Sequence, residues 1–191
     1  GSMVEQLERE KGEHHKLGVG KKNFLVILTV FKLINFIKKN KIDVIHARSR
    51  LPAWVCYIAL KGIKKNIRPI FITTVHGPYS VNFYSSIMTK GDKVIVVSEM
   101  IRQYVLKNYK IDKKKLFLNY RGVSSKFFPF NFKAPNNWAK SWYSDFPQTK
   151  NKIILTLPAR ITRWKGQEDF LNLIKGIIDK HPNVHGLIVG D

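Results

Sequence analysis

The sequence has very little cysteine: Cys56 stands alone among 191 residues. Because a disulfide needs two thiols, none can form within the chain, and this is typical of a protein that works in a reducing cytoplasm. Neither His46 nor His76 has a cysteine or carboxylate at the spacing of a zinc site. We therefore expect a cytoplasmic location and no bound metal.

Acidic residues are also scarce, with 13 Asp and Glu against 34 Lys and Arg, which gives a formal net charge of +21. Such an excess favours anionic partners, namely nucleic acid, anionic lipid headgroups or phosphorylated small molecules. The chain is also rich in Lys, Ile, Asn and Phe together, so a compositional bias of the genome accounts for part of the charge. Charge alone leaves all three classes of partner open.

No hydrophobic run is long enough to span a membrane. The most apolar stretch, FLVILTVFKLINFI at 24–37, is fourteen residues long and is interrupted by Lys32, whereas a spanning helix needs about 20. We predict a core helix instead, with a buried face made of Leu25, Leu28, Phe31, Ile34 and Ile37. Its lysines leave peripheral contact with an anionic membrane open.

Several catalytic and nucleotide-binding fingerprints are missing as well. The sequence has no Walker motif, no dinucleotide-binding glycine pattern and no Ser-His-Asp or Cys-His arrangement with supporting context. The segment GVGKK at 18–22 is glycine-rich but lacks the Ser or Thr of a P-loop and follows no clear strand. P-loop nucleotidases and serine or cysteine hydrolases are therefore disfavoured.

Apolar runs and helical patterns alternate along most of the chain. Four runs are predicted as strands, at 42–47, 68–77, 92–98 and 115–123. Helical patterns precede and separate them, at 4–12, 22–40, 52–62, 80–90 and 99–109. Because the strands are continuous apolar runs joined by helices, the pattern predicts an α/β fold with a parallel, Rossmann-like sheet covered on both faces.

A second strand–helix–strand unit follows at 152–160, 166–181 and 184–191. The stretch between the two parts, residues 125–150, carries three prolines with several Asn and Ser, and we predict an irregular connection there. We expect a first lobe over 1–130, a connection over 131–150 and the start of a second Rossmann-like lobe over 151–191.

Polar residues and glycines stand where the predicted strands end, which is where parallel sheets bind their ligands. The candidates are His46 and Arg48 at the end of the first strand, His76 and Gly77 at the end of the second, and Gly122 at the end of the fourth. Each also has a structural interpretation: a histidine satisfied by its neighbours, or a glycine that a tight turn requires. Both interpretations stay open for each residue.

The segment LPARITRWKGQ at 157–167 places Arg160 at the end of a predicted strand and Lys165 at the mouth of the following helix. Free N–H groups at a helix N-terminus attract anions, and Arg and Lys add direct contacts to phosphate oxygens. The segment is therefore a candidate diphosphate site. A solvated loop in a very basic protein is the alternative.

Six pieces of the sequence, in order, resemble a family 4 retaining glycosyltransferase of the GT-B architecture, which has two Rossmann-like lobes. They are IDVIHARSRLPAW, FITTVHGPY, GDKVIVVSEMI, LNYRGVSSKFFPF, ARITRWKGQEDFLNLIKGI and VHGLIVGD. Among members of that family, the chain is most similar to those that build bacterial lipopolysaccharide or other envelope glycans.

The resemblance implies a role for each lobe. The second lobe would bind a nucleotide-diphosphate sugar, with Arg160 and Lys165 on the diphosphate. The first lobe would bind a glycan or lipid-linked acceptor, with His76 near the transferred sugar as the catalytic candidate. Retention is attributed to attack on the face that the nucleotide leaves, with the leaving phosphate taking the proton. No divalent metal or other cofactor is implied.

The sequence also departs from the family's pattern. The family's first strand and glycine-rich loop would precede residue 1, the paired-glutamate segment of the donor site would follow residue 191, and Ser124 stands where Asp is common. We therefore expect an internal piece of a longer enzyme, lacking the first strand of its first lobe and truncated in its second. An expressed piece, a split gene and a decaying gene all fit this expectation.

The leading functional prediction is sugar transfer to an envelope-glycan acceptor, weak or absent in this chain alone, with a complementary chain as a further partner. The alternative is a basic module that binds nucleic acid or an anionic membrane without catalysis. The sequence offers no recognised nucleic-acid-binding fold, which disfavours nucleic acid as the partner.

Overall fold

The structure is a computed structural model, and it describes residues 2–18 and 26–190. Apart from Gly18, the GVGKK segment lies outside the described residues, as does Leu25. Contacts within the chain divide it into two units, Gly1–Gly122 (unit 1) and Val123–Asp191 (unit 2). Each unit is described by itself.

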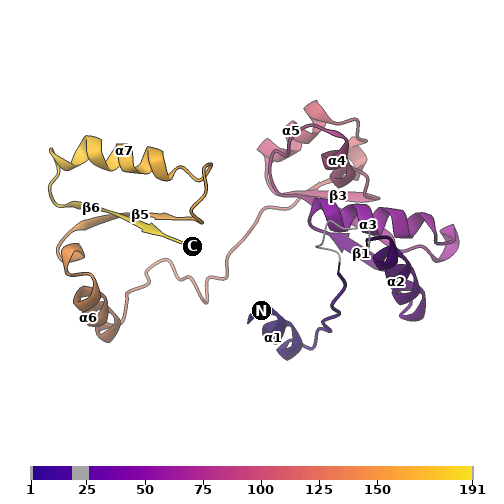
Figure 1. Cartoon of the computed structure of the whole chain (residues 1–191), viewed down its shortest axis with the longest axis horizontal. Coiled ribbons are helices and arrows are strands. Elements are labelled where there is room, and N and C mark those ends of the chain that lie inside the picture. Colours follow the sequence, from indigo (N-terminus) through magenta and orange to yellow (C-terminus); the bar gives the residue numbers. More distant parts are fainter. Residues whose placement is uncertain (1, 19–25, 191) are drawn as a thin grey trace. The chain divides into compact units, whose positions relative to one another are not determined.

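Unit 1 alternates helices and strands as predicted (Figure 1). Its helices are α1 (Ser2–Arg9), α2 (Val26–Lys39), α3 (Arg50–Lys61), α4 (Phe83–Ser86) and α5 (Glu99–Asn108). Its strands are β1 (Val44–Ala47), β2 (Ile70–Val75), β3 (Lys93–Val96) and β4 (Leu116–Leu118). Short 3₁₀ turns lie at η1 (Lys65–Ile67), η2 (Ile87–Thr89) and η3 (Lys113–Lys115).

The four strands of unit 1 form one parallel sheet in the order β1-β2-β3-β4. Ile45 of β1 lies opposite Phe71 of β2, and Thr73 of β2 lies opposite Val94 of β3. Strand order follows chain order, so each strand pairs with the one before it. This sheet confirms the predicted α/β, Rossmann-like class.

The core of unit 1 is built from the apolar strand residues and from the packed pair α2 and α3 (Figure 1). Ala53, Val55 and Ala59 of α3 have no exposed surface, and Phe71, Val94 and Val96 fill the sheet side of the core. The small side chains of α3 let this helix approach its neighbours closely. The prediction of a continuous buried strand pattern holds for β2 and β3.

The predicted buried face of the 24–37 helix was wrong. The buried side chains of α2 are Thr29, Val30, Leu33 and Ile37, while Leu28 and Phe31 are 55% and 59% exposed. A strict spacing of three residues falls behind the helical repeat of 3.6 by about 60° at each step. Five such positions therefore wind around the helix, and of the four that the structure describes only Ile34 and Ile37 lie against the core.

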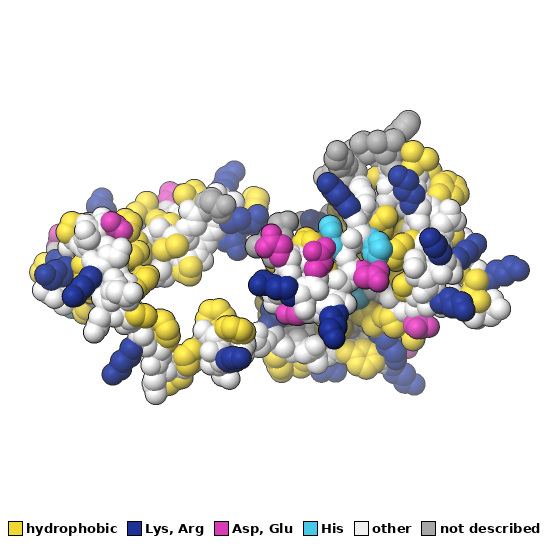
Figure 2. Space-filling model, turned by 90° about the horizontal axis from the view of Figure 1, so that it is seen from below, with side chains coloured by type: hydrophobic (Ala, Val, Ile, Leu, Met, Phe, Trp, Pro, Cys, Tyr) yellow, Lys and Arg dark blue, Asp and Glu magenta, His cyan; other side chains and the backbone are white. Residues whose placement is uncertain are grey.

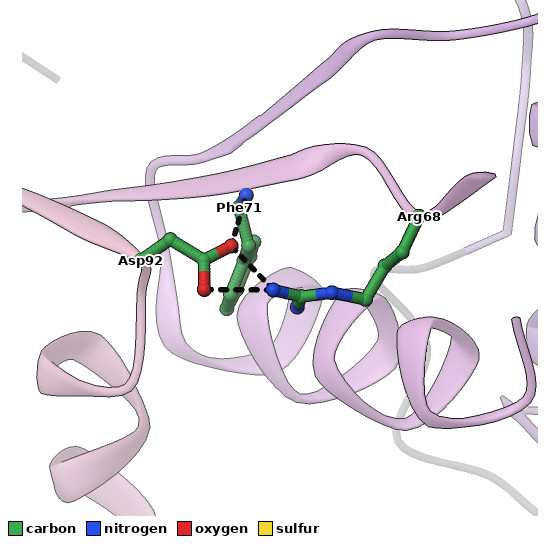
Figure 3. Close-up of polar contacts among 3 residues, drawn as sticks. All are labelled: Arg68, Phe71 and Asp92. Carbon is green, nitrogen blue, oxygen red and sulfur yellow. Dashed lines mark hydrogen bonds and ion pairs between the residues drawn. The ribbon is translucent and has the colours of Figure 1, made fainter. Parts of the chain in front are cut away.

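A carboxylate ties the start of β2 to the start of β3 (Figure 3). Arg68 donates through one guanidinium nitrogen to both oxygens of Asp92, at 2.8 and 2.9 Å, and the backbone N–H of Phe71 donates to Oδ2 at 2.8 Å. Partial burial opposes ionisation of Asp92, yet the hydrogen bonds from Phe71 and Arg68 hold its pKa below the usual value. We call these three residues the Asp92 latch.

Unit 2 consists of helix α6 (Asn136–Asp145), a 3₁₀ turn η4 (Pro147–Thr149), strand β5 (Ile153–Pro158), helix α7 (Gln167–Ile178) and strand β6 (Val184–Val189). The strands β5 and β6 are parallel and pair in register from Ile153↔Val184 to Pro158↔Val189. Helix α7 packs against β6. This is the predicted strand–helix–strand unit.

Helix α6 corrects the prediction of an irregular connection over 125–150. Trp138, Trp142 and Phe146 recur four residues apart, which places them on one side of a helix. The rings of Trp138 and Trp142 stack with centroids 5.5 Å apart, and Trp142 Nε1–H donates to Thr149 Oγ1 at 2.9 Å. The prolines and Asn residues around this stretch favoured the prediction of an irregular segment, whereas the spacing of its aromatic residues indicates a helix.

Among the helices that the structure describes, none is long and apolar enough to cross a membrane.

Candidate active site

The carboxyl ends of the strands in unit 1 surround one cavity. Because all four strands run in the same direction, the residues that follow them meet at one edge of the sheet. The cavity has a volume of about 210 Å³. Its lining residues come from β1, β2 and β3 and from the segments that follow the four strands: His46, Arg48, Thr74, His76, Ile95, Val97, Asn119, Tyr120 and Arg121.

His46 lies on β1 beside the buried hydroxyl group of Thr74 on β2. The distance between His46 Nε2 and Thr74 Oγ1 is 2.6 Å, which is a short hydrogen bond. Partial burial, followed by the positive charge of Arg48, lowers the pKa of His46. The imidazole of His46 is therefore favoured in its neutral form at pH 7.

His76, just after β2, is held by Arg121, which follows β4. A guanidinium nitrogen of Arg121 lies 2.7 Å from Nδ1 of His76. Because a guanidinium group can only donate, Nδ1 must accept, and the proton of the neutral imidazole is then on Nε2. Partial burial and the charges of Arg121, Arg48 and His46 lower the pKa of His76. His76 is therefore a neutral ring whose Nε2–H is a hydrogen-bond donor.

The structure brings three of the predicted residues, His46, Arg48 and His76, to the same cavity. Sequence reasoning missed Thr74 and Arg121. Arg121 lies beside Gly122 near the end of the strand predicted over 115–123, but its contact with His76 depends on how the strands pair. Nothing in the sequence marks Thr74 as a site residue, because it lies in the interior of the strand predicted over 68–77.

The two predicted strand-end glycines, Gly77 and Gly122, do not line the cavity. Neither has a positive φ, and a Cβ built on either would have no atom within 4 Å. The turn geometry at these positions therefore does not require glycine. A ligand-facing role for them stays a prediction.

The second predicted site lies in unit 2, in the loop between β5 and α7. Its geometry is set by Gly166, which caps α7 with a φ of 79°, and by Gln167, whose side chain donates to the backbone oxygen of Arg160 at 2.8 Å. The backbone N–H of Lys165 donates to the oxygen of Thr162 at 3.0 Å. Arg160 and Lys165 thus both belong to one short, internally bonded loop.

A cavity of about 380 Å³ lies at this loop and at the first turn of α7. Its lining includes Arg163 and Gln167 but also two carboxylates, Glu168 and Asp169, which stand where the helix dipole favours negative charge. Arg160 and Lys165 are not among its lining residues. An anion held by these two cations would therefore lie outside this cavity.

Gly190 lies beside the backbone at Arg160. Its φ is 154°, and a Cβ built on it would lie 2.1 Å from the carbonyl oxygen of Ala159. The backbone N–H of Ala159 in turn donates to the oxygen of Val189 at 2.9 Å. Only glycine fits at this position, and its close approach fixes where the Arg160 loop starts.

Among the described residues, no group of three or more His, Cys, Asp or Glu side chains is placed to hold a metal ion. The cavity of unit 1 holds two histidines without a carboxylate, so its donor set does not suit a zinc ion.

A parallel four-stranded Rossmann-like sheet with a polar cavity at its carboxyl edge, followed by a second parallel unit, matches part of a GT-B glycosyltransferase. The Glycosyltransferase Family 4 domain matches residues 5–127, and the chain belongs to this family.

A solved glycosyltransferase from Rickettsia africae ESF-5 is similar over the whole chain, with 28% sequence identity and a TM-score of 0.70. The match covers 100% of this chain and 58% of the Rickettsia chain, so the present chain spans little more than half of its length. No curated protein matches the chain.

Proposed function

We propose that this chain takes part in transferring a sugar from a nucleotide-diphosphate sugar to a glycan or lipid-linked acceptor of the bacterial envelope. Membership of glycosyltransferase family 4 is the observation that carries the proposal. The cavity at the carboxyl edge of unit 1 supports it, because this is the edge at which parallel α/β sheets bind ligands. Since the chain spans 58% of the Rickettsia glycosyltransferase, the proposal includes weak or no turnover by this chain alone.

The donor diphosphate is assigned to Arg160 and Lys165 of unit 2. The loop that carries them is fixed at its start by Gly190 and at its end by Gly166, so the two cations project from an ordered backbone. A guanidinium group binds two phosphate oxygens at once, and the Lys ammonium adds a compact charge. Both would stabilise the negative charge that develops on the diphosphate as it leaves.

His76 is assigned to the transferred sugar. Its Nδ1 is occupied by Arg121, so what it offers a ligand is the Nε2–H group. That group can donate to a sugar hydroxyl, and it cannot remove a proton while the contact with Arg121 lasts. His76 would therefore position the sugar, and the proton of the acceptor hydroxyl would pass to the leaving phosphate.

The first experiment is calorimetric titration of the chain with UDP-, GDP- and ADP-sugars. We expect one of them to bind and Arg160→Ala to weaken it by about 10- to 150-fold, since a charged hydrogen bond contributes about 1.5–3 kcal/mol. Arg163→Ala in the same loop is the matched control and should bind nearly as well as the wild type. Equal affinity of Arg160→Ala and wild type would refute the donor assignment.

We further propose that the protein works in the cytoplasm and touches the inner face of the membrane. An aromatic segment at the start of unit 2 supports this: Phe127, Phe128, Phe130 and Phe132 are all exposed and stand between Lys126 and Lys133. Aromatic rings insert at membrane interfaces and lysines attract anionic headgroups. The wild type should sediment with anionic vesicles but not with neutral ones. The variant Phe128→Ser/Phe130→Ser should stay in the supernatant with both.

A basic binding module without catalysis is the second candidate, favoured by the net charge of +21. On the face shown in Figure 2, however, Lys and Arg side chains occur over both units without gathering in one patch. Such spread charge supports nonspecific attraction more than a defined nucleic-acid groove. Tight RNA or DNA binding with a steep salt dependence, in a protein that binds no nucleotide sugar, would favour this candidate.

A further inference from the structure

The cavity at the carboxyl edge of unit 1 is electropositive and lacks a balancing carboxylate. Two guanidinium groups, those of Arg48 and Arg121, line it together with the two imidazoles, and none of its lining residues is acidic. Two other arginines of unit 1 are paired with carboxylates: Arg68 with Asp92, and Arg102 with Glu99. The two cations of this cavity, in contrast to Arg68 and Arg102, have no carboxylate among the residues around them.

The histidines show the effect of this uncompensated charge. Besides partial burial, Arg48 lowers the pKa of His46, and Arg121 and Arg48 both lower the pKa of His76. Two basic groups that are discouraged from taking up protons by their neighbours indicate a positive local potential. A bound anion would offset the positive charge and raise both pKa values.

The hydrogen-bonding groups around the cavity also suit an anion. Arg48 and Arg121 can only donate, and His76 offers Nε2–H because Nδ1 is taken. The side-chain amide of Asn119 and the hydroxyl of Tyr120 add two further donors at the same edge. A group with several oxygen acceptors and negative charge would satisfy these donors, whereas a neutral sugar would leave two guanidinium charges unmatched.

We propose that this cavity binds a phosphate group, held between Arg48 and Arg121 with Nε2–H of His76 as a further donor. The inference rests on the proposed function and deepens it: the acceptor is a phosphorylated glycan or lipid phosphate rather than a neutral one. A phosphate of the sugar donor has the same chemistry, and the experiment separates the two sources.

The test is titration of the chain with inorganic phosphate at low ionic strength, followed by NMR of the histidine ring nitrogens. We expect phosphate to raise the pKa of His76 in the wild type. Arg48→Gln should weaken phosphate binding about tenfold, and Arg48→Gln/Arg121→Gln should abolish the pKa response. Circular dichroism and thermal unfolding establish that each variant is folded.

Lys64→Gln/Lys114→Gln is the matched control, because it removes the same charge from exposed positions of unit 1. If it weakens phosphate binding as much as the arginine variants do, or if the histidines do not respond to phosphate, the proposal is wrong. Both results leave nucleotide-sugar binding through Arg160 intact, so the proposed function is judged separately by the Arg160→Ala titration.

The source of the phosphate is settled by competition. Glycerol 1-phosphate that competes with inorganic phosphate in the wild type, while UDP does not, supports an acceptor phosphate. UDP that competes, and does so equally in Arg160→Ala, would instead place the donor diphosphate in this cavity and overturn the acceptor assignment.

Discussion

Arg121 donates from its guanidinium group to Nδ1 of His76 across 2.7 Å, joining two residues that lie 45 positions apart in the sequence. The contact fixes the tautomer of the histidine and adds a positive charge beside it. It joins the end of β4 to the end of β2, across the intervening strand β3. The chemistry of His76 is therefore set by a residue on another strand.

Arg121→Ala should raise the pKa of His76 toward its ordinary value of about 6.5. The substitution removes both a neighbouring charge that disfavours the imidazolium and the donor that occupies Nδ1. Titration of the His76 ring by NMR measures the change. Arg102→Ala, which breaks a surface pair with Glu99, is the control and should leave the His76 pKa where it is. An unchanged pKa in Arg121→Ala would contradict the assignment.

The stability of unit 1 should fall as the pH is lowered from about 7 through 6. The folded-state pKa values of His46 and His76 are lowered, so the unfolded chain binds more protons than the folded one below about 6.5. The stability that the two neutral histidines contribute is complete above about pH 6.5, and it is lost as the pH falls through their folded-state pKa values. Urea unfolding at several pH values should show this slope, and His46→Gln/His76→Gln should flatten it. A slope of the same size in that variant would exclude the two histidines as its cause.

Asp92→Ala should destabilise unit 1 by about 1–3 kcal/mol, because it removes the charged acceptor shared by Arg68 and the Phe71 N–H. The pKa of Asp92 is lowered, so its contribution is present above the unfolded-state pKa of about 4 and is lost as the pH falls through its folded-state value. Thermal unfolding at pH 7 compares this variant with Asp43→Ala, an exposed carboxylate of the same unit. Equal unfolding temperatures for the two variants would show that the Asp92 latch contributes little.

Gly190→Ala should displace the Arg160 loop, because the new Cβ would lie 2.1 Å from the Ala159 carbonyl oxygen. We expect loss of nucleotide-sugar affinity comparable to that of Arg160→Ala. Gly176→Ala in α7 is the control, since a Cβ there meets nothing within 4 Å and alanine favours a helix by about 0.5–1 kcal/mol. If Gly190→Ala binds as tightly as Gly176→Ala, the close approach does not position Arg160.

Much of the fold was predictable because each buried strand is a continuous apolar run flanked by clear breaks. The strands β1 to β4 and the β5–α7–β6 unit follow from this pattern alone. The two wrong predictions concern the positions of side chains around a helix axis, which composition does not give. The buried face of α2 was misassigned because a three-residue spacing was taken as a helical one, and α6 was missed because only Trp138, Trp142 and Phe146 mark its period.

The sequence predicted the site residues that stand at the end of a single strand, but it did not predict their partners on other strands. His46, Arg48 and His76 each follow or end an apolar run, and the parallel sheet brings them together. Their partners depend on pairing between strands, which a local pattern does not contain. Thr74 meets His46 across the β1–β2 ladder, and Arg121 reaches His76 only because β4 joins the same sheet.

The strand order of unit 1 also sets the order in which its cavity can be assembled. Because every strand pairs with its immediate predecessor, the sheet can grow outward one strand at a time as the chain leaves the ribosome. His46 and His76 come together once β2 has paired with β1. Arg121 arrives later, on the chain that follows β4, so the tautomer of His76 is set only once β4 has joined the sheet.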